Sequence, residues 1–151
     1  MADVDFIKKV INHPQIAPFI RDDGTPKDLN INYEKVVTDR NLFFLIMIND
    51  KMEKCGYFFF HPWNSFCFEV HTLILPEYRG EEASKFCEEG ATWIFNETQC
   101  RKIVTQVPTW NNRAYALAKK AGMKTEGMNE ASFLWHGKLY DQYLMGIKKE
   151  N

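Results

Sequence analysis

The stretch from Thr72 to Ser84 has the residues and spacing to hold a negatively charged ligand. An apolar run, Leu73 to Leu75, ends at Pro76, and a helical pattern begins after Arg79-Gly80. The first backbone N–H groups of a helix lack intrahelical partners and lie at the positive end of its dipole, so such a junction can bind phosphate or pyrophosphate. An ordinary connection between a strand and a helix shows the same glycine, so the junction alone leaves both interpretations open.

Glu69 and His71 are the side chains best placed to move a proton. They lie two residues apart on a predicted strand, so both point to the same face of the sheet. A carboxylate beside an imidazole can relay a proton to or from a reacting group. The alternative is that the pair faces a solvated rim or bonds to core groups.

The elements that must position these groups follow from the apolar pattern. The pattern predicts a first helix at 6–11, strands at 42–49, 56–60, 66–75 and 102–107, helices at 81–97 and 111–121, and a closing hairpin of 132–135 and 138–147. The segment from Arg21 to Asn30 is dense in turn formers and is expected to be an exposed loop that could border a substrate entrance. This order predicts an α/β (α+β) protein with a mixed, mostly antiparallel central sheet and helices on both faces.

The composition argues against several classes of partner. The chain has 151 residues, the size of one domain spanning 1–151, and its net charge of −1 offers no footprint for nucleic acid or an anionic membrane. With acidic Asp3 and Asp5 near the start and no apolar run of spanning length, a cytoplasmic protein is expected. Four widely spaced cysteines (Cys55, Cys67, Cys87 and Cys100) predict reduced thiols and no metal site.

Three motifs in a fixed order link these elements to a known family. They are Ile74-Leu75-Pro76-Glu77-Tyr78-Arg79-Gly80 followed by Ala83; Asn111-x-x-Ala114-x-x-Leu117-x-x-Lys120-x-Gly122-Met123; and Gly137-Lys138-Leu139-Tyr140-Asp141 ending in Leu144-Met145. From about Leu42 to Lys149 the chain resembles the GNAT superfamily of acyl-CoA-dependent N-acetyltransferases. Within that superfamily it looks most like the small GNAT-type proteins encoded by tailed phages and prophages.

The resemblance implies that the chain moves an acetyl group from acetyl-CoA, the acyl donor, to a primary amine of a small molecule or protein by direct attack with general-base help. The backbone of the Leu73 to Leu75 strand would pair with the pantetheine arm, and the following turn would cradle the pyrophosphate. The implied cofactor-binding residues are Leu73, Ile74, Leu75, Arg79, Gly80, Glu81, Glu82, Ala83, Ser84, Asn111 and Ala114.

The same resemblance assigns roles in the chemistry. A free amine has a pKa of about 10.4, so a base must remove its proton. Glu69 and His71, beside the cofactor strand, are the candidates, and the N–H of Ile74 is expected to hold the oxyanion. Many relatives have a tyrosine acid directly after the helix leucine, where this chain has Ala118. Tyr115 is the candidate substitute acid, with ordinary packing as its alternative role.

Departures from the family pattern support a second hypothesis. Glu82 occupies a position that is usually small, Gln106 stands where some relatives carry a glutamate base, and Ala118 lacks a hydroxyl group. The alternative is a GNAT-fold binding or interaction protein with reduced catalysis, such as a phage accessory protein in the host cytoplasm. By analogy with the family, Trp63, Trp110, Trp135 and Tyr140 wall the amine pocket, and the terminal strands could form a homodimer.

Overall fold

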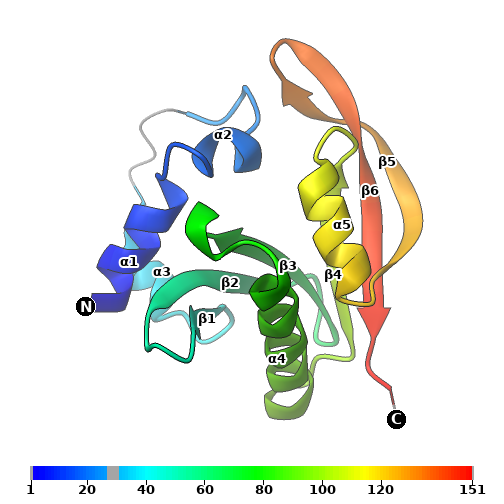
Figure 1. Ribbon diagram of the computed structural model, residues 1–151. Coiled ribbons are helices and arrows are strands. Elements are labelled where there is room, and N and C mark those ends of the chain that lie inside the picture. The colour runs from blue at the N-terminus through cyan, green and yellow to red at the C-terminus, as the bar shows by residue number, and fades with distance from the viewer. Residues whose placement is uncertain (1, 27–30, 151) are drawn as a thin grey trace.

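The computed structural model describes residues 2–26 and 31–150, and a six-stranded sheet with the order β1-β2-β3-β4-β6-β5 forms its centre (Figure 1). The strands are β1 (Phe43–Ile48), β2 (Lys54–Pro62), β3 (Cys67–Ile74), β4 (Lys102–Pro108), β5 (Lys124–Trp135) and β6 (Lys138–Lys148). Neighbouring strands pair antiparallel except for β3 and β4, which are parallel. This confirms the predicted mixed, mostly antiparallel sheet.

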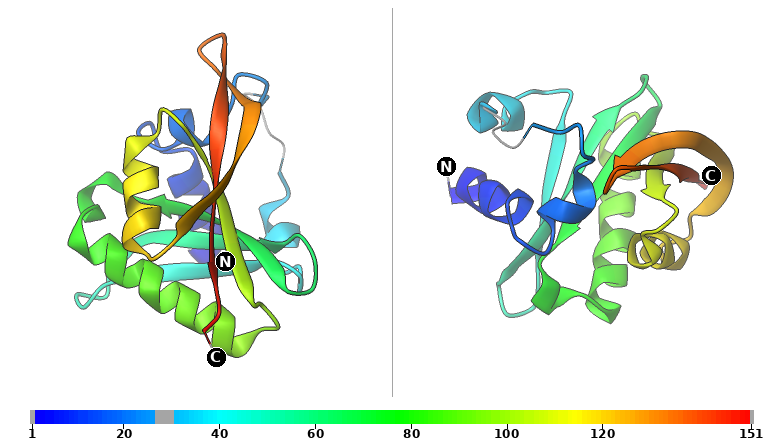
Figure 2. Two further views of the ribbon diagram at one scale, coloured as in Figure 1. Left: turned by 90° about the vertical axis from the view of Figure 1, so that its right-hand side faces the viewer. Right: turned by 90° about the horizontal axis from the view of Figure 1, so that it is seen from above.

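Helices cover both faces of this sheet, as the sequence predicts. They are α1 (Ala2–Ile11), α2 (Ala17–Ile20), α3 (Tyr33–Val37), α4 (Glu81–Glu97) and α5 (Asn112–Lys120), with a 3-10 turn, η1 (Pro76–Tyr78), before α4. Seen from above, α1 and α3 lie on one side of β2 and β3, and α4 lies on the other (Figure 2). No helix within the described residues is long and apolar enough to cross a membrane.

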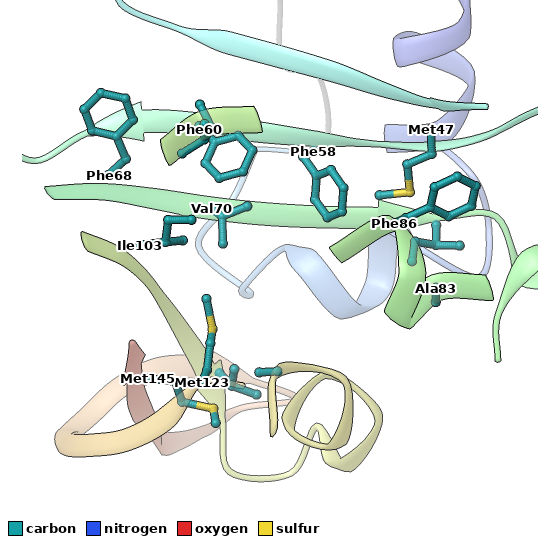
Figure 3. Close-up of a cluster of buried hydrophobic side chains, with 14 of the residues drawn as sticks. Met47, Phe58, Phe60, Phe68, Val70, Ala83, Phe86, Ile103, Met123 and Met145 are labelled. Carbon is teal, nitrogen blue, oxygen red and sulfur yellow. The ribbon is translucent and has the colours of Figure 1, made fainter. Parts of the chain in front are cut away.

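Alternate side chains of β2 and β3 point to opposite faces, and each face packs against its own helices. Phe58 and Val70 are buried with Phe86 of α4 in one apolar cluster, part of which Figure 3 shows. Tyr57 and Leu73 are buried with α1 side chains in a second cluster on the opposite face. We call these two sides of the sheet the α4 face and the α1 face. Any residue of β3 can be assigned to a face from its position in this alternation.

The sheet is split between β3 and β4. The parallel pairing joins Cys67–Glu69 only to Lys102–Val104. Beyond these residues β3 continues to Ile74 paired with β2 alone, while β4 continues to Pro108 paired with β6 alone. The two strands therefore form a V that is closed at Glu69 and open toward the starts of α4 and α5.

The structure corrects the predicted elements at two places, and a third prediction lies partly outside the described residues. The short helices α2 and α3 were missed, because helices of four and five residues are too short to show a helical period. The strand expected to begin at Ser132 begins at Lys124, because two register shifts in β5 and its exposed polar residues break the alternation that marks a strand. The loop expected at 21–30 is described only to residue 26, and 27–30 lie outside the described residues.

Candidate active site

A cavity of about 920 Å³ occupies the open part of the V. Its walls come from β3, β4, the first turns of α4 and α5, and the segment from Gln15 to Ile20 that includes α2. These segments are far apart in the sequence, and the split in the sheet is what brings them around one space. A cavity of this size and apolar lining is typical of a small-molecule site.

The backbone N–H and C=O groups of β3 point alternately toward β2 and toward β4, so only some of them face the cavity. The N–H of Leu75 donates to the Cys55 carbonyl at 2.9 Å, so the odd-numbered residues turn their backbone groups toward β2. The N–H of Lys102 donates to the Phe66 carbonyl at 3.0 Å, so the even-numbered residues turn theirs toward β4. Where β4 has moved away, the even-numbered residues face the open V.

Val70, Thr72 and Ile74 are those residues, and all three line the cavity. Their backbone N–H and C=O groups form an open strand edge to which an extended amide-containing ligand could pair as another strand would. The expectation that the strand from Leu73 to Leu75 offers its backbone is therefore refined. Leu73 and Leu75 direct their backbone groups to β2, and only Ile74 of the three directs its N–H into the gap.

The start of α4 closes one end of the cavity. Gly80, the residue before the helix, has φ +122° and ψ −144°, a conformation that suits glycine, and provides no side-chain cap for the first helical N–H groups. The hydroxyl oxygen of Ser84, in the first turn, is buried without a hydrogen-bond partner among the described residues and lines the cavity. Unpartnered donors and the positive end of a helix dipole together favour an anionic ligand.

Positive side chains reinforce this end. Arg79 lies at the α4 end, and Arg113 and Lys120 of α5 line the cavity with it. Burial, and after it the nearby Arg113 charge, lower the pKa of Arg79. Arg113 was not among the predicted site residues, and Lys120 was named only as part of the second motif, without a role. Both residues lie on the helix that Asn111 caps, and this position in the sequence could have indicated that they belong to the site.

Asn111 has a structural role that the sequence prediction did not include. It is the N-cap of α5, and its Oδ1 accepts a hydrogen bond from the Ala114 N–H at 3.2 Å. The cap uses the amide oxygen and leaves the amide nitrogen as a donor at the cavity wall. Asn111 can therefore cap the helix and bind a ligand carbonyl at once.

On the α1 face, near the closed end of the V, two histidines and a carboxylate meet. Glu69 Oε2 lies 3.0 Å from His61 Nε2 and accepts a hydrogen bond from Trp63 Nε1 at 3.1 Å. His61 Nε2 lies 3.0 Å from His71 Nε2. His61 was not among the predicted site residues, although the pairing of β2 with β3 places it directly opposite Glu69.

The two imidazole rings meet edge to edge. Their centres are 5.2 Å apart with planes inclined by 14°, while the facing Nε2 atoms are 3.0 Å apart. This is the geometry of an N–H···N hydrogen bond, in which one ring donates and the other accepts. The cluster brings three donor atoms within 4.8 Å, but nitrogens that point at each other do not converge on a metal ion.

The environment of His71 favours its neutral form. The pKa of His71 is lowered, chiefly because the surrounding protein displaces water from the ring, with the His61 charge adding to this and the Glu69 charge opposing it. The side chain is nevertheless exposed to the cavity, so a ligand can reach it. A neutral imidazole in contact with a carboxylate-bound partner can accept a proton at neutral pH.

Aromatic side chains form another part of the cavity wall. Trp110, after β4, stacks on Trp135 of β5 with ring centres 3.9 Å apart and planes inclined by 11°. Trp135 Nε1 donates to the Pro18 carbonyl at 3.1 Å, which ties the β5–β6 hairpin to α2. Asp23 adds a second tie, because its carboxylate accepts from the Gly137 N–H at 2.6 Å in the hairpin turn.

Most of the residues expected at the site lie around this one cavity. Those that line it are Glu69, His71, Leu73, Ile74, Arg79, Gly80, Glu81, Ala83, Ser84, Asn111 and Ala114. Leu75, Glu82 and Tyr115 do not line it. The Tyr115 hydroxyl lies 3.2 Å from Thr125 Oγ1 and its ring packs on Tyr143, so the structure separates this candidate acid from the others. Although residues three apart share a helix face, the Tyr115 hydroxyl reaches β5, and Ala118 lines the cavity without it.

Comparison with solved structures identifies the fold. No family model and no curated protein matches the sequence. The spermidine N-acetyltransferase from Vibrio cholerae, in complex with CoA and spermine, has a TM-score of 0.83 at 21% identity, covering 97% of this chain and 90% of that chain. A candidate phosphinothricin N-acetyltransferase has a TM-score of 0.76 at 15% identity, covering 99% of this chain and 94% of that chain. The chain thus has the fold of the GNAT N-acetyltransferases.

Proposed function

We propose that this protein is an acetyl-CoA-dependent N-acetyltransferase that acts on a primary amine. The observation that carries the proposal is the free edge of β3 inside the cavity, with an anion-binding helix start at one end and a carboxylate–imidazole cluster on the other face. The structural neighbour from Vibrio cholerae is described in complex with CoA, which supports the choice of donor. Spermidine, the acceptor named for that neighbour, is not carried over at 21% identity.

The donor would lie along the α4–α5 side of the V. The first turn of α4, Ser84 and the pair Arg79 and Arg113 would hold its phosphates, and the edge of β3 would pair with its amide groups. The side chain of Ala114 is small, so the donor's extended arm would fit beside α5. Acetyl-CoA, when bound, supplies the reaction with an acetyl thioester.

The acceptor amine would enter from the α1 face. His71 accepts the proton that the attacking nitrogen loses, and His61 and Glu69 stabilise the resulting positive charge across their 3.0 Å contacts. The N–H of Ile74 faces the gap and can donate a hydrogen bond to the carbonyl oxygen as negative charge develops there. The new bond joins nitrogen to the acetyl carbon, and the bond from that carbon to sulfur breaks.

The thiolate would leave without a dedicated protein acid. Ala118 lines the cavity but has no hydroxyl group, and Tyr115 is turned toward β5. A thiol has a pKa of about 8.5, so its thiolate is a tolerable leaving group near neutral pH. The missing acid therefore predicts a slower reaction rather than none.

Calorimetry and CoA release test the proposal together. Acetyl-CoA at about one hundred times its dissociation constant should stabilise the fold by about 2.7 kcal/mol, which raises Tm by roughly 5–10 °C for a chain of this size. A panel of primary amines should then release free CoA. Binding without turnover on any amine would favour the alternative, a GNAT-fold protein with reduced catalysis. No heat and no shift in Tm would reject both the donor and the enzymatic interpretation.

A further inference from the structure

The α1 side of the cavity carries a rigid aromatic wall. Phe19 of α2, Trp110 and Phe133 of β5 all line it, and Phe19 and Phe133 have ring centres 5.9 and 6.1 Å from that of Trp110. Trp135 stacks behind Trp110 and is itself fixed by its hydrogen bond to the Pro18 carbonyl. Phe19 remains 42% exposed, so this wall has apolar surface left for a ligand to cover. A flat apolar group gains most from such a wall, because aromatic rings pack well on one another.

The charge on this side is small. Among the described residues, Glu69 and Glu81 are the only carboxylates that line the cavity. Glu81 belongs to the first turn of α4, at the anion-binding end, so among the described residues Glu69 is the one carboxylate that lines the cavity on the α1 face. A polyamine carries several ammonium groups, and each one that leaves water needs a partner. One carboxylate matches one ammonium group.

We propose that the acceptor is a monoamine in which the primary amine is attached to an aromatic or similarly flat apolar group. The ring would lie against Phe19, Trp110 and Phe133, and the amine would point toward the cluster of Glu69, His61 and His71. Trp110 Nε1 is buried without a partner among the described residues. This inference rests on the proposed function and specifies its acceptor.

Phenethylamine and spermidine are the probes that separate this proposal from a polyamine acceptor. With acetyl-CoA saturating, kcat/KM for phenethylamine should exceed that for spermidine by at least about tenfold, the discrimination expected of one well-packed apolar group. Equal or faster turnover of spermidine would overturn the proposal and leave the proposed function intact. If neither amine is acetylated, calorimetric titration into the CoA-bound protein decides. Binding of phenethylamine but not spermidine supports the assigned site, and the absence of phenethylamine binding overturns it.

Variants of the wall make the test specific to these residues. Phe19→Ala removes an exposed ring with little risk to folding and should raise KM for phenethylamine roughly tenfold. Trp110→Leu should raise this KM further. A normal CoA-induced shift in the Tm of the Trp110→Leu variant verifies that it is folded. The matched control is Trp93→Leu, a tryptophan of α4 that is 42% exposed and lies outside the cavity. An unchanged KM in both Phe19→Ala and Trp110→Leu would overturn the proposal.

An added carboxylate should shift the preference in the opposite direction. Gln142 of β6 lines the cavity on the same side, so Gln142→Glu gives a second ammonium group a partner there. The ratio of kcat/KM for phenethylamine to that for spermidine should fall several-fold. A ratio that stays constant or rises would contradict the assignment of charge on this side.

Discussion

The two sides of the cavity in the split sheet are built from different kinds of chain segment. The α4–α5 side consists of continuous motifs, because the β3 edge, the turn at Gly80 and the first turn of α4 follow one another in sequence. The α1 side is assembled from α2, the residue after β4 and the β5–β6 hairpin, and is fixed by the bonds from Trp135 to Pro18 and from Asp23 to Gly137. One side is set by local backbone geometry, and the other by tertiary contacts.

This difference suggests separate roles under the proposed function. A donor that is the same in every turnover suits a surface of backbone N–H groups and a helix start, which needs few particular side chains. An acceptor that varies among proteins of one fold suits a surface of side chains on loops and a hairpin tip. Substitutions should therefore affect donor binding or acceptor use, but seldom both.

The largest expected effect comes from blocking the donor side. Ala114→Trp places an indole in the cavity where α5 borders the V, and it should abolish the Tm shift caused by CoA. Lys119→Trp, on an exposed position of the same helix outside the cavity, is the matched control and should keep the full shift. Differential scanning fluorimetry with and without CoA measures both. A normal shift in Ala114→Trp would place the donor elsewhere.

Among substitutions on the acceptor side, removal of the proposed base, His71, should lower kcat most. His71→Asn should lower kcat by about 10²- to 10⁴-fold, the usual contribution of a positioned general base. His61→Asn should lower it less, because His71 itself would remain. The dissociation constant of CoA should not change in either variant, which single-turnover assays and calorimetry can check. Comparable kcat in wild type and His71→Asn at saturating amine would remove this residue from the mechanism.

The sequence predicted the donor side better than the acceptor side for a physical reason. The break at Pro76, the glycine at position 80 and the helical period that follows are local signals, and the structure has the strand end and helix start where they indicate. His61 and Phe19 gave no such signal. Their places depend on the register between β2 and β3 and on how α2 packs against Trp110, which are properties of the folded chain.

Removing one donor-side charge should have an intermediate effect. Arg113→Ala should weaken CoA binding roughly tenfold to a hundredfold, the worth of one charge-assisted hydrogen bond. Added salt should reduce the difference from wild type, because ions screen the attraction to phosphate. Lys119→Ala, also on α5 but outside the cavity, is the control. The amine KM should stay constant, and a change in amine KM alone would assign Arg113 to the other side.

Removing the hydrogen bonds between the β5–β6 hairpin and the loop before α3 should have a milder effect. Asp23→Ala removes the acceptor for the N–H groups of His136 and Gly137, 3.1 and 2.6 Å away. A loss of about 1 kcal/mol in the free energy of unfolding corresponds to a fall in Tm of roughly 2–4 °C. The amine KM should rise while CoA affinity stays the same. Asp23→Asn, which keeps one side-chain acceptor, should show a smaller change in urea melts and in KM.

The smallest effect concerns the dependence of stability on pH, and it tests whether the acceptor side keeps His71 neutral. The pKa of His71 is lowered from 6.5 by the folded protein, so the unfolded chain binds this proton more readily than the native state does. The His71 contribution to stability is therefore intact above about pH 6.5 and is lost as the pH falls through the lowered pKa of the folded state. His71→Asn should flatten the fall in the free energy of unfolding between pH 7 and pH 5, measured by urea denaturation. A steeper fall in the variant would mean that the folded protein favours the charged imidazole, and His71 could not then accept a proton from the amine at neutral pH.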